Sequence, residues 1–255
     1  MPKSIFLSHG SPMIAVLDNE YTRFLTKLGA SMKPKAIVLF SAHWESEELT
    51  VSFHDGTYET IYDFYGFPDE LYQVQYPAKG STQIATEVER SFAARGISVN
   101  RDESRGLDHG SWSLLKHLYP NADIPVVQIS VNPFLSSEKQ LLIGEALSEL
   151  DEDILLIGSG ASVHNLRMLK WEQTEPEPWA VQFDDWLIEK LEKKQWSELA
   201  SYQEHAPHAS LAVPRAEHFV PLFIALGSAG DGLNPKVIHR SYELGTLSYM
   251  CLSFN

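Results

Sequence analysis

The chain has 255 residues, of which 44% are hydrophobic, and a formal net charge of −14. These totals suit one large α/β domain, and the acidic balance excludes a nucleic-acid partner, because phosphate binding needs clustered Lys and Arg. The single cysteine, Cys251, excludes an intrachain disulfide and fits a reducing cytoplasm, and the N-terminal segment has no long apolar stretch that predicts a signal peptide or a membrane span.

Short apolar runs alternate with helical patterns along the chain. In chain order, we expect strands at 4–8, 35–43 and 49–55, a helix at 81–96, a strand at 96–101, a helix at 111–120, a strand at 124–131, a helix at 137–153, a strand at 153–160, one or two helices over 177–202, a helix beginning within 216–230, and a strand at 245–254. The helix at 137–153 is capped by Ser136 or Ser137. The alternation predicts an α/β fold, a single domain over 1–255 with a central mostly parallel or mixed sheet flanked by helices on both faces.

Three histidines follow buried strands. His9, His43 and His164 come at or just after the strands at 4–8, 35–43 and 153–160. In open α/β sheets, ligands bind outside the carboxyl ends of the strands. These three histidines therefore predict a site at that edge of the sheet.

Two more histidines join this group. His109 belongs to "LDHGSW", which nearly repeats "LSHGSP" around His9, and His218 lies near the start of the helix within 216–230. A histidine followed by glycine favours a tight turn that presents the imidazole. Neutral imidazole is the commonest protein metal ligand and a frequent acid or base. We expect the remaining five histidines to be exposed or structural: His54, His117, His205, His208 and His239.

The serines beside these histidines do not indicate a serine hydrolase. Neither Ser11 nor Ser111 lies in the G-x-S-x-G elbow that exposes a nucleophile. The loop "GSGAS", Gly158 to Ser162, lacks that pattern and also lacks the spacing of a phosphate-binding loop.

Five sequence blocks, in order, carry a resemblance to a known family. "HGSP", "SAHWE", "DHGSWSLLKHLYPNADIPVVQIS", "GSGASVHNLR" and "EHFVPLFIALGSAG" together resemble the class III extradiol ring-cleavage dioxygenases, in particular their DOPA 4,5-dioxygenase-like branch. The similarity runs from about Leu7 to the C-terminal strand. It therefore covers nearly the whole chain.

The resemblance implies one mononuclear metal ion. It implies that His9, His43 and His218 are ligands, that His164 is either a further ligand or the acid/base beside the metal, and that His109 contacts the substrate. Glu217 stays open as an alternative to His218, because better-known members of this class use two histidines and one glutamate. Iron(II) is expected for activity, and zinc is possible in the isolated protein.

The resemblance also implies the reaction and its partners. A catechol, such as a DOPA-like substrate, reacts with O2 and opens to a muconic semialdehyde. The aromatic-rich segment 58–77 offers Tyr62, Phe64, Tyr65 and Phe67 as walls for the ring, with Tyr65 and Phe67 as the predicted substrate-binding residues. These rings could instead pack the loop onto the core. We expect a cytoplasmic protein that is a monomer or a small homo-oligomer.

Two other classes of function stay open. One is a zinc hydrolase or lyase that uses the same histidines, with Glu217 or Glu45 as the base. The other is a non-catalytic metal-binding relative. All five histidines are present, which makes the non-catalytic class the less favoured of the two.

Overall fold

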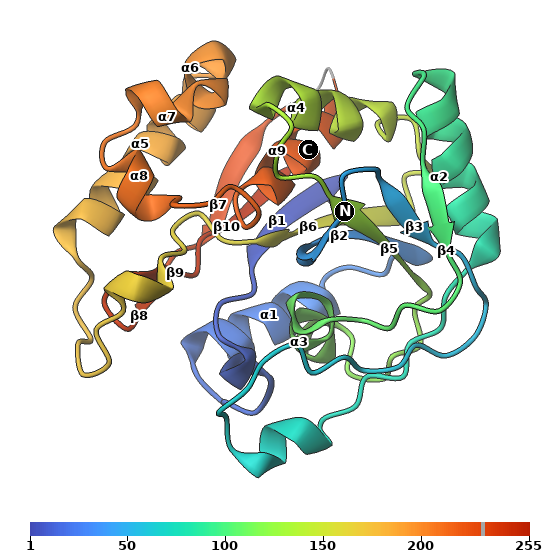
Figure 1. Ribbon diagram of the computed structural model, residues 1–255, viewed down its shortest axis with the longest axis horizontal. Helices are drawn as coiled ribbons and strands as arrows, with labels where there is room; N and C mark the ends of the chain where they lie inside the picture. Colours follow the sequence, from blue (N-terminus) through green and yellow to red (C-terminus); the bar gives the residue numbers. More distant parts are fainter. Residues whose placement is uncertain (231–232) are drawn as a thin grey trace.

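The computed structural model describes residues 1–230 and 233–255. A twisted sheet lies at its centre (Figure 1), and this sheet has eight strands. The strand order is β4-β3-β5-β2-β6-β1-β10-β7, with parallel and antiparallel pairs. Its strands are β1 (Ser4–Ser8), β2 (Ala36–Glu45), β3 (Thr50–Ser52), β4 (Asn100–Asp102), β5 (Val126–Val131), β6 (Ile154–Gly160), β7 (Pro235–His239) and β10 (Cys251–Phe254), and the pair β8 (Tyr242–Glu243) and β9 (Leu247–Ser248) lies outside it. The predicted α/β fold with a mixed sheet is confirmed.

Helices cover both faces of the sheet (Figure 1). The α-helices are α1 (Glu20–Ala30), α2 (Thr82–Ala94), α3 (His109–Leu118), α4 (Ser137–Ala146), α5 (Pro178–Glu192), α6 (Trp196–Ala200), α7 (Tyr202–His205), α8 (Ala209–Ala212) and α9 (Val220–Ser228), and the 3-10 helices are η1 (Pro12–Ala15), η2 (Asp69–Gln73) and η3 (Leu166–Met168). Within residues 1–230 and 233–255, no helix is both long and apolar enough to cross a membrane.

The sheet separates two apolar cores. Alternate side chains of β1 enter different cores, because successive residues of a strand point to opposite faces. Phe6 belongs to the core that also contains residues of α2, α4, α5 and α9, whereas Ile5 and Leu7 belong to the core that contains residues of α1 and α3. All three side chains are fully buried, and each such burial contributes about 1.5–3 kcal/mol. Burial on both faces explains why the central strands read as continuous apolar runs.

The three central strands bring the first histidines together. β2, β6 and β1 are neighbours in that order and run parallel, so their carboxyl ends lie at one edge of the sheet. His9 directly follows β1, His43 lies near the end of β2, and His164 comes shortly after β6. The predicted placement of these histidines at one sheet edge is therefore confirmed.

The glycines of β6 allow the start of α9 to approach the sheet. A Cβ atom on Gly158 would lie 2.3 Å from the carbonyl oxygen of Pro221, and one on Gly160 would lie 2.0 Å from that of His218. The N–H of Ala161 donates a hydrogen bond to the same His218 carbonyl, at 2.8 Å. The Gly-Ser-Gly segment thus brings the backbone of His218 against β6.

The two His-Gly-Ser segments have different conformations. Gly10 has a φ of +55° and forms a turn, as predicted, and Ser11 then caps η1 by accepting a hydrogen bond from the N–H of Met13. His109 instead begins α3, two residues before the predicted helix, because Asp108 accepts a hydrogen bond from the N–H of Ser111 as the N-cap. The prediction of a turn was wrong for the second segment.

Other boundaries also differ from the prediction. The whole of α1 was missed, although Asn19 and Thr22 form a capping box at its start. Helix α4 is capped by Ser136 and ends at Ala146, seven residues before the predicted end. The strand predicted at 245–254 is interrupted between β9 and β10. Helices over 177–202 are confirmed.

We expect the substitution Gly160→Ala to disturb the histidine site as well as the fold. The added methyl group would meet the His218 carbonyl at 2.0 Å, so β6 and the segment before α9 must move apart, at a cost of roughly 1–3 kcal/mol. Urea unfolding measures this loss, with Gly56→Ala as the control because its nearest atom is 3.6 Å away. Equal stability of the two variants would contradict the close approach.

Candidate metal centre

The five predicted histidines lie together at the carboxyl edge of the central strands. The ring centroids of His9, His43 and His218 form a nearly equilateral triangle with sides of 4.8, 5.0 and 5.0 Å. The ring of His109 lies 4.0 Å from that of His43, and the ring of His164 lies 3.5 Å from that of His218. One site therefore contains all five rings.

Hydrogen bonding fixes the tautomer of His9. Its Nδ1 atom lies 2.9 Å from the hydroxyl oxygen of Ser159, and that hydroxyl donates its own proton to the carbonyl of Gly110. Since the serine oxygen must then accept, Nδ1 of His9 carries the proton and Nε2 has a free lone pair. Ser159 also links the turn that contains His9 to the helix that begins at His109.

His43 and His218 have carboxylates at the same ring position. Nδ1 of His43 lies 3.1 Å from Oδ2 of Asp63, and Nδ1 of His218 lies 3.1 Å from Oε1 of Glu217. A nearby carboxylate favours the tautomer with the proton on Nδ1, an arrangement typical of metal-bound histidines. In both residues Nε2 is left with the lone pair.

The inward nitrogen atoms fit a cation. The Nε2 atoms of His9 and His43 lie 3.0 Å apart, where two lone pairs repel each other. Two ligands at right angles with bonds of about 2.1 Å have the same separation of about 3.0 Å. Nε2 of His218 is buried without a hydrogen-bond partner among residues 1–230 and 233–255. A metal ion would remove the repulsion between the first two atoms, and the ring of His218 lies 5.0 Å from each of their rings.

His164 is stacked on His218. The two rings are nearly parallel, with an interplanar angle of 9° and centroids 3.5 Å apart. Ring nitrogen lone pairs lie in the ring plane, so two stacked rings do not direct them at one ion within bonding distance. This geometry favours His164 as a neighbour of the metal over His164 as a ligand beside His218.

Glu217 lies behind His218. The potential ligand atoms of His164, Glu217 and His218 lie within 4.8 Å of one another, as do those of His9, His43 and His109. However, Oε1 of Glu217 accepts from His218, and its Oε2 lies 3.5 Å from the guanidinium of Arg215. Glu217 therefore supports His218 in this arrangement.

Burial keeps His9, His164 and His218 neutral. Desolvation lowers the pKa of His9 and of His218 well below the usual value, and the neighbouring imidazoles lower both further. Burial also lowers the pKa of His164, to about 4. Metal ligation needs the neutral imidazole, so His9 and His218 are in the form that can bind a metal at neutral pH.

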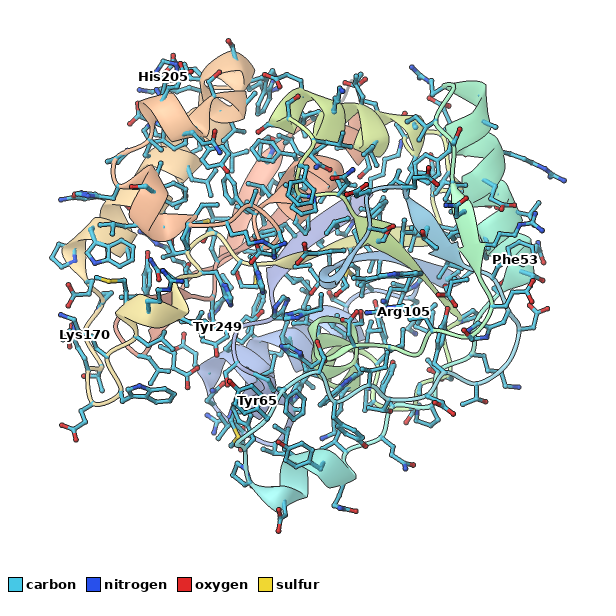
Figure 2. All side chains as sticks on the ribbon, in the orientation of Figure 1. Phe53, Tyr65, Arg105, Lys170, His205 and Tyr249 are labelled. Carbon is cyan, nitrogen blue, oxygen red and sulfur yellow. The ribbon has the colours of Figure 1, made fainter. Side chains whose placement is uncertain are left out.

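One aromatic ring of the segment 58–77 contacts the site. Phe64 lies edge-on to His109, with ring centroids 5.6 Å apart, and Phe67 packs against Phe64 at 5.4 Å. Tyr65 is 92% exposed and lies on the loop in the lower part of Figure 2. The substrate-binding roles of Tyr65 and Phe67 stay predictions, and Phe64 is the ring closest to the histidines.

Sequence reasoning missed Asp63 and Ser159 as members of the site. Asp63 is one of several acidic residues in an aromatic-rich segment, and Ser159 lies in a loop considered for phosphate binding. Asp108, which directly precedes His109, accepts hydrogen bonds from Ser41 and Gln128 and caps α3. Only the folded chain shows which carboxylate faces a ring.

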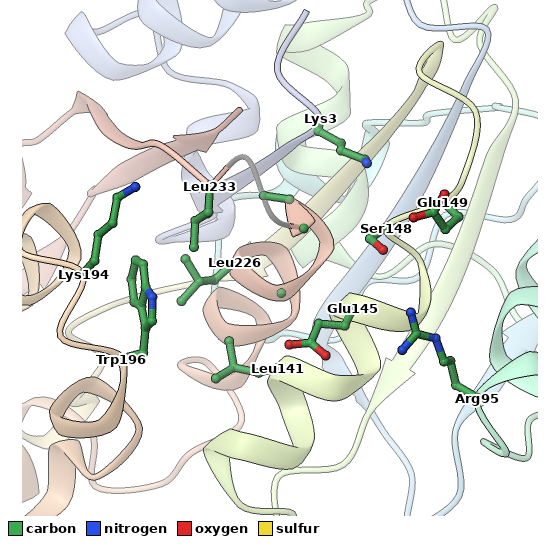
Figure 3. Close-up of a pocket in the computed structure, with 13 residues that line it drawn as sticks. Lys3, Arg95, Leu141, Glu145, Ser148, Glu149, Lys194, Trp196, Leu226 and Leu233 are labelled. Atoms are coloured by element: carbon green, nitrogen blue, oxygen red, sulfur yellow. The ribbon is translucent and has the colours of Figure 1, made fainter.

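The structure also has a cavity of about 850 Å³ at the opposite end of β1 (Figure 3). Lys3, which precedes β1, lies on its wall, whereas His9 follows the same strand. Its other wall residues include Arg95, Leu141 and Trp196. The cavity is therefore separate from the histidine site.

Comparisons with known proteins show the family of this chain. The family model described as the catalytic LigB subunit of aromatic ring-opening dioxygenase matches residues 3–252. The chain is 42% identical over 258 residues to the 4,5-DOPA dioxygenase extradiol of Beta vulgaris, covering 99% of this chain and 96% of that protein. It is 39% identical over 254 residues to the protein of the same name from Escherichia coli strain K12, covering 97% and 92%.

A solved structure shares the whole fold. The crystal structure of an uncharacterized protein from Escherichia coli K12 matches with a TM-score of 0.85 and 34% sequence identity, covering 100% of both chains. With the family match over residues 3–252, the chain belongs to the aromatic ring-opening dioxygenases of the extradiol class.

We expect the stability of the metal-free protein to fall as the pH drops from 7 toward 4. The buried rings of His9, His164 and His218 have lowered pKa values, so the unfolded chain takes up protons near pH 6.5 that the folded chain does not bind. Each such histidine adds a slope of up to about 1.4 kcal/mol per pH unit.

Urea unfolding at several pH values measures this slope. The variant His164→Gln should show a shallower slope than the unsubstituted protein, because it lacks one of the buried neutral rings. The variant His205→Gln is the control, since His205 lies in α7, away from the site. The same slope in His164→Gln and the unsubstituted protein would contradict the assignment.

Proposed function

We propose that the protein cleaves the ring of a DOPA-like catechol with O2, using one iron(II) ion held by His9, His43 and His218. The observation that carries this proposal is the facing pair of Nε2 atoms of His9 and His43, 3.0 Å apart, with the ring of His218 5.0 Å from each of theirs and a side-chain oxygen beside Nδ1 of all three residues. Three imidazoles at one side of an ion leave positions open, which suits a non-haem oxygenase. When bound there, iron(II) would bring the two catechol oxygens and dioxygen together and pass electrons between them.

We propose His164 as the acid/base of the reaction. A catechol loses a proton when it binds a metal through both oxygens, and a neutral imidazole near the metal can accept it. His164 lies against the ring of the ligand His218, and its pKa of about 4 keeps it neutral before substrate binds. The same ring can return the proton as the aromatic ring opens.

We propose that His109 orients the substrate. Its ring lies between His43 and Phe64, with centroids 4.0 and 5.6 Å away. Its Nδ1 atom faces Asp63 at 2.9 Å, which leaves Nε2 for a substrate hydroxyl or for oxygen. Phe64 then offers an apolar edge for the catechol ring beside that nitrogen.

The carboxylates of the site do not favour a zinc hydrolase. A hydrolytic base must reach a water molecule on the metal, but Glu217 is engaged by His218 and Arg215. Glu45 is held by both terminal nitrogen atoms of the Arg215 guanidinium. Glu45 is therefore fully occupied, whereas Glu217 uses Oε1 for His218 and its Oε2 is buried beside Arg215 without a hydrogen-bond partner among residues 1–230 and 233–255.

The remaining expectations are proposals of the same kind. We propose that residues 1–255 act as one catalytic domain in the cytoplasm, as a monomer or a small homo-oligomer. One sheet that joins β1 to β10, near both ends of the chain, supports the single domain. The name 4,5-DOPA dioxygenase extradiol of two relatives supports the substrate class.

We expect oxygen uptake and a yellow ring-opened product when the metal-free protein is loaded anaerobically with iron(II) and then given L-DOPA and air. His43→Ala should lose bound metal and activity together. His164→Gln should keep the metal but lose about 10²–10⁴-fold in kcat, the usual contribution of an acid/base group. No uptake with L-DOPA or simple catechols, despite one bound metal per chain, would contradict the proposed function.

The aromatic residues can be tested in the same assay. We expect Phe64→Ala to raise KM for the catechol, because it removes the ring beside His109. Tyr65→Ala should change KM less, since that side chain is 92% exposed in the absence of substrate. A larger effect from Tyr65→Ala than from Phe64→Ala would show that the loop closes over the substrate with Tyr65 inward.

A further inference from the structure

We infer that Asp63 is a positioning residue that serves two histidines at once, and so couples metal binding at His43 to the orientation of His109. Oδ2 of Asp63 lies 3.1 Å from Nδ1 of His43, and Oδ1 lies 2.9 Å from Nδ1 of His109. One carboxylate thus touches a proposed metal ligand and the proposed substrate-orienting residue. The inference rests on the function proposed above.

The backbone holds this carboxylate in place. Oδ1 of Asp63 accepts a hydrogen bond from the backbone N–H of His109, at 2.9 Å. That N–H belongs to the first turn of α3, a ten-residue helix whose positive end favours a negative charge. Asp63 is therefore attached to the helix that carries one of its two imidazole partners.

The loop before Asp63 is also fixed to the same part of the chain. The N–H of Ile61 donates to the carbonyl of Leu107, at 2.8 Å, and the indole N–H of Trp112 donates to the carbonyl of Ile61, at 2.9 Å. Both partners flank His109 in sequence. These hydrogen bonds fix the position of Asp63 relative to His109. The ring of His43 then contacts the other oxygen of the same carboxylate.

The charge of Asp63 sets the tautomer of both rings. The two carboxylate oxygens of Asp63 each face a ring nitrogen, Oδ2 at 3.1 Å from Nδ1 of His43 and Oδ1 at 2.9 Å from Nδ1 of His109. The Nδ1 atom of His109 is buried, and its N–H is not directed along the line to Oδ1, so the attraction is an electrostatic contact. A lone pair on either Nδ1 would face a negative oxygen at about 3 Å, and both rings therefore keep the proton there.

This sharing has a consequence for the reaction. A cation on Nε2 of His43 makes its Nδ1–H more positive and draws Asp63 toward it. Because the same carboxylate also contacts His109, metal binding at His43 should change the surroundings of the His109 ring, while Nδ1 of His109 keeps its proton and Nε2 stays free for the substrate. In the metal-free protein Asp63 lies 3.1 Å from Nδ1 of His43 and 2.9 Å from Nδ1 of His109.

The test compares Asp63→Asn with Asp69→Asn, a substitution of an exposed aspartate in the same segment. With zinc alone, competition against a chelator should show 10–100-fold weaker binding for Asp63→Asn, the usual effect of removing a carboxylate behind a metal-bound histidine. Asp69→Asn should bind zinc as the unsubstituted protein does. Unchanged zinc affinity in Asp63→Asn would overturn the inference.

Nitrogen NMR of ¹⁵N-histidine in the zinc-loaded protein tests the sharing itself. We expect one Nδ1–H tautomer for both His43 and His109, a tautomer mixture for His109 in Asp63→Asn, and recovery in Asp63→Glu. If Asp63→Asn fails to fold, the resonances of His109 in the unsubstituted protein must still change when zinc is added. If the nitrogen resonances of His109 change neither on addition of zinc nor in Asp63→Asn, Asp63 supports His43 alone.

Measurements of ring-opening activity distinguish a failure of this inference from a failure of the proposed function. At saturating iron(II), Asp63→Asn should lower kcat, and adding it to His109→Gln should lower kcat little further, because both changes remove the same orientation. Independent, multiplying losses would contradict the coupling. If the unsubstituted protein lacks ring-opening activity, the proposed function fails, while the zinc and NMR results still decide the role of Asp63.

Discussion

Two imidazole lone pairs that face each other at 3.0 Å repel, and in this protein the Nε2 atoms of His9 and His43 are held that way. Neither ring can relieve the repulsion by exchanging tautomers easily, because Ser159 and Asp63 occupy the opposite nitrogen atoms. The ring of His218 lies 5.0 Å from both of these rings, and its Nε2 atom is buried without a hydrogen-bond partner among residues 1–230 and 233–255. A single cation bound between His9 and His43 would remove the repulsion, so the surrounding fold is arranged to hold a metal ion.

A few features of the fold place these three histidines. The parallel strands β2, β6 and β1 deliver His9 and His43 to one edge of the sheet, and the absence of a side chain at Gly160 lets His218 reach the same edge. Ser159, between the two glycines of β6, supports His9 and also contacts Gly110 in the second His-Gly-Ser segment. The Gly-Ser-Gly sequence of β6 therefore serves packing and ligand orientation together. It positions two of the three proposed ligands without touching the metal itself.

Much of this was predictable from the sequence, and the reasons are physical. Buried parallel strands are continuous apolar runs, so the strands that precede His9, His43 and His164 could be recognised, and the edge at which they end followed from the fold class. The contacts of Asp63 and Ser159 could not be predicted, since each depends on backbone segments that meet only after folding. The conformation of the second His-Gly-Ser segment was also misjudged, because a buried Asp108 caps a helix there. Local sequence identity did not imply local structural identity.

The central claim is that three imidazoles, each through Nε2, hold one metal ion while His164, His109 and Glu217 stay outside its ligand set. X-ray absorption spectroscopy of the protein loaded with one equivalent of zinc tests this claim most directly. The structure predicts three imidazole nitrogens at about 2.0–2.1 Å and water or buffer oxygen in the remaining position. A fourth imidazole in the fit, or the loss of an oxygen neighbour in Glu217→Gln that shows a bound carboxylate, would contradict it.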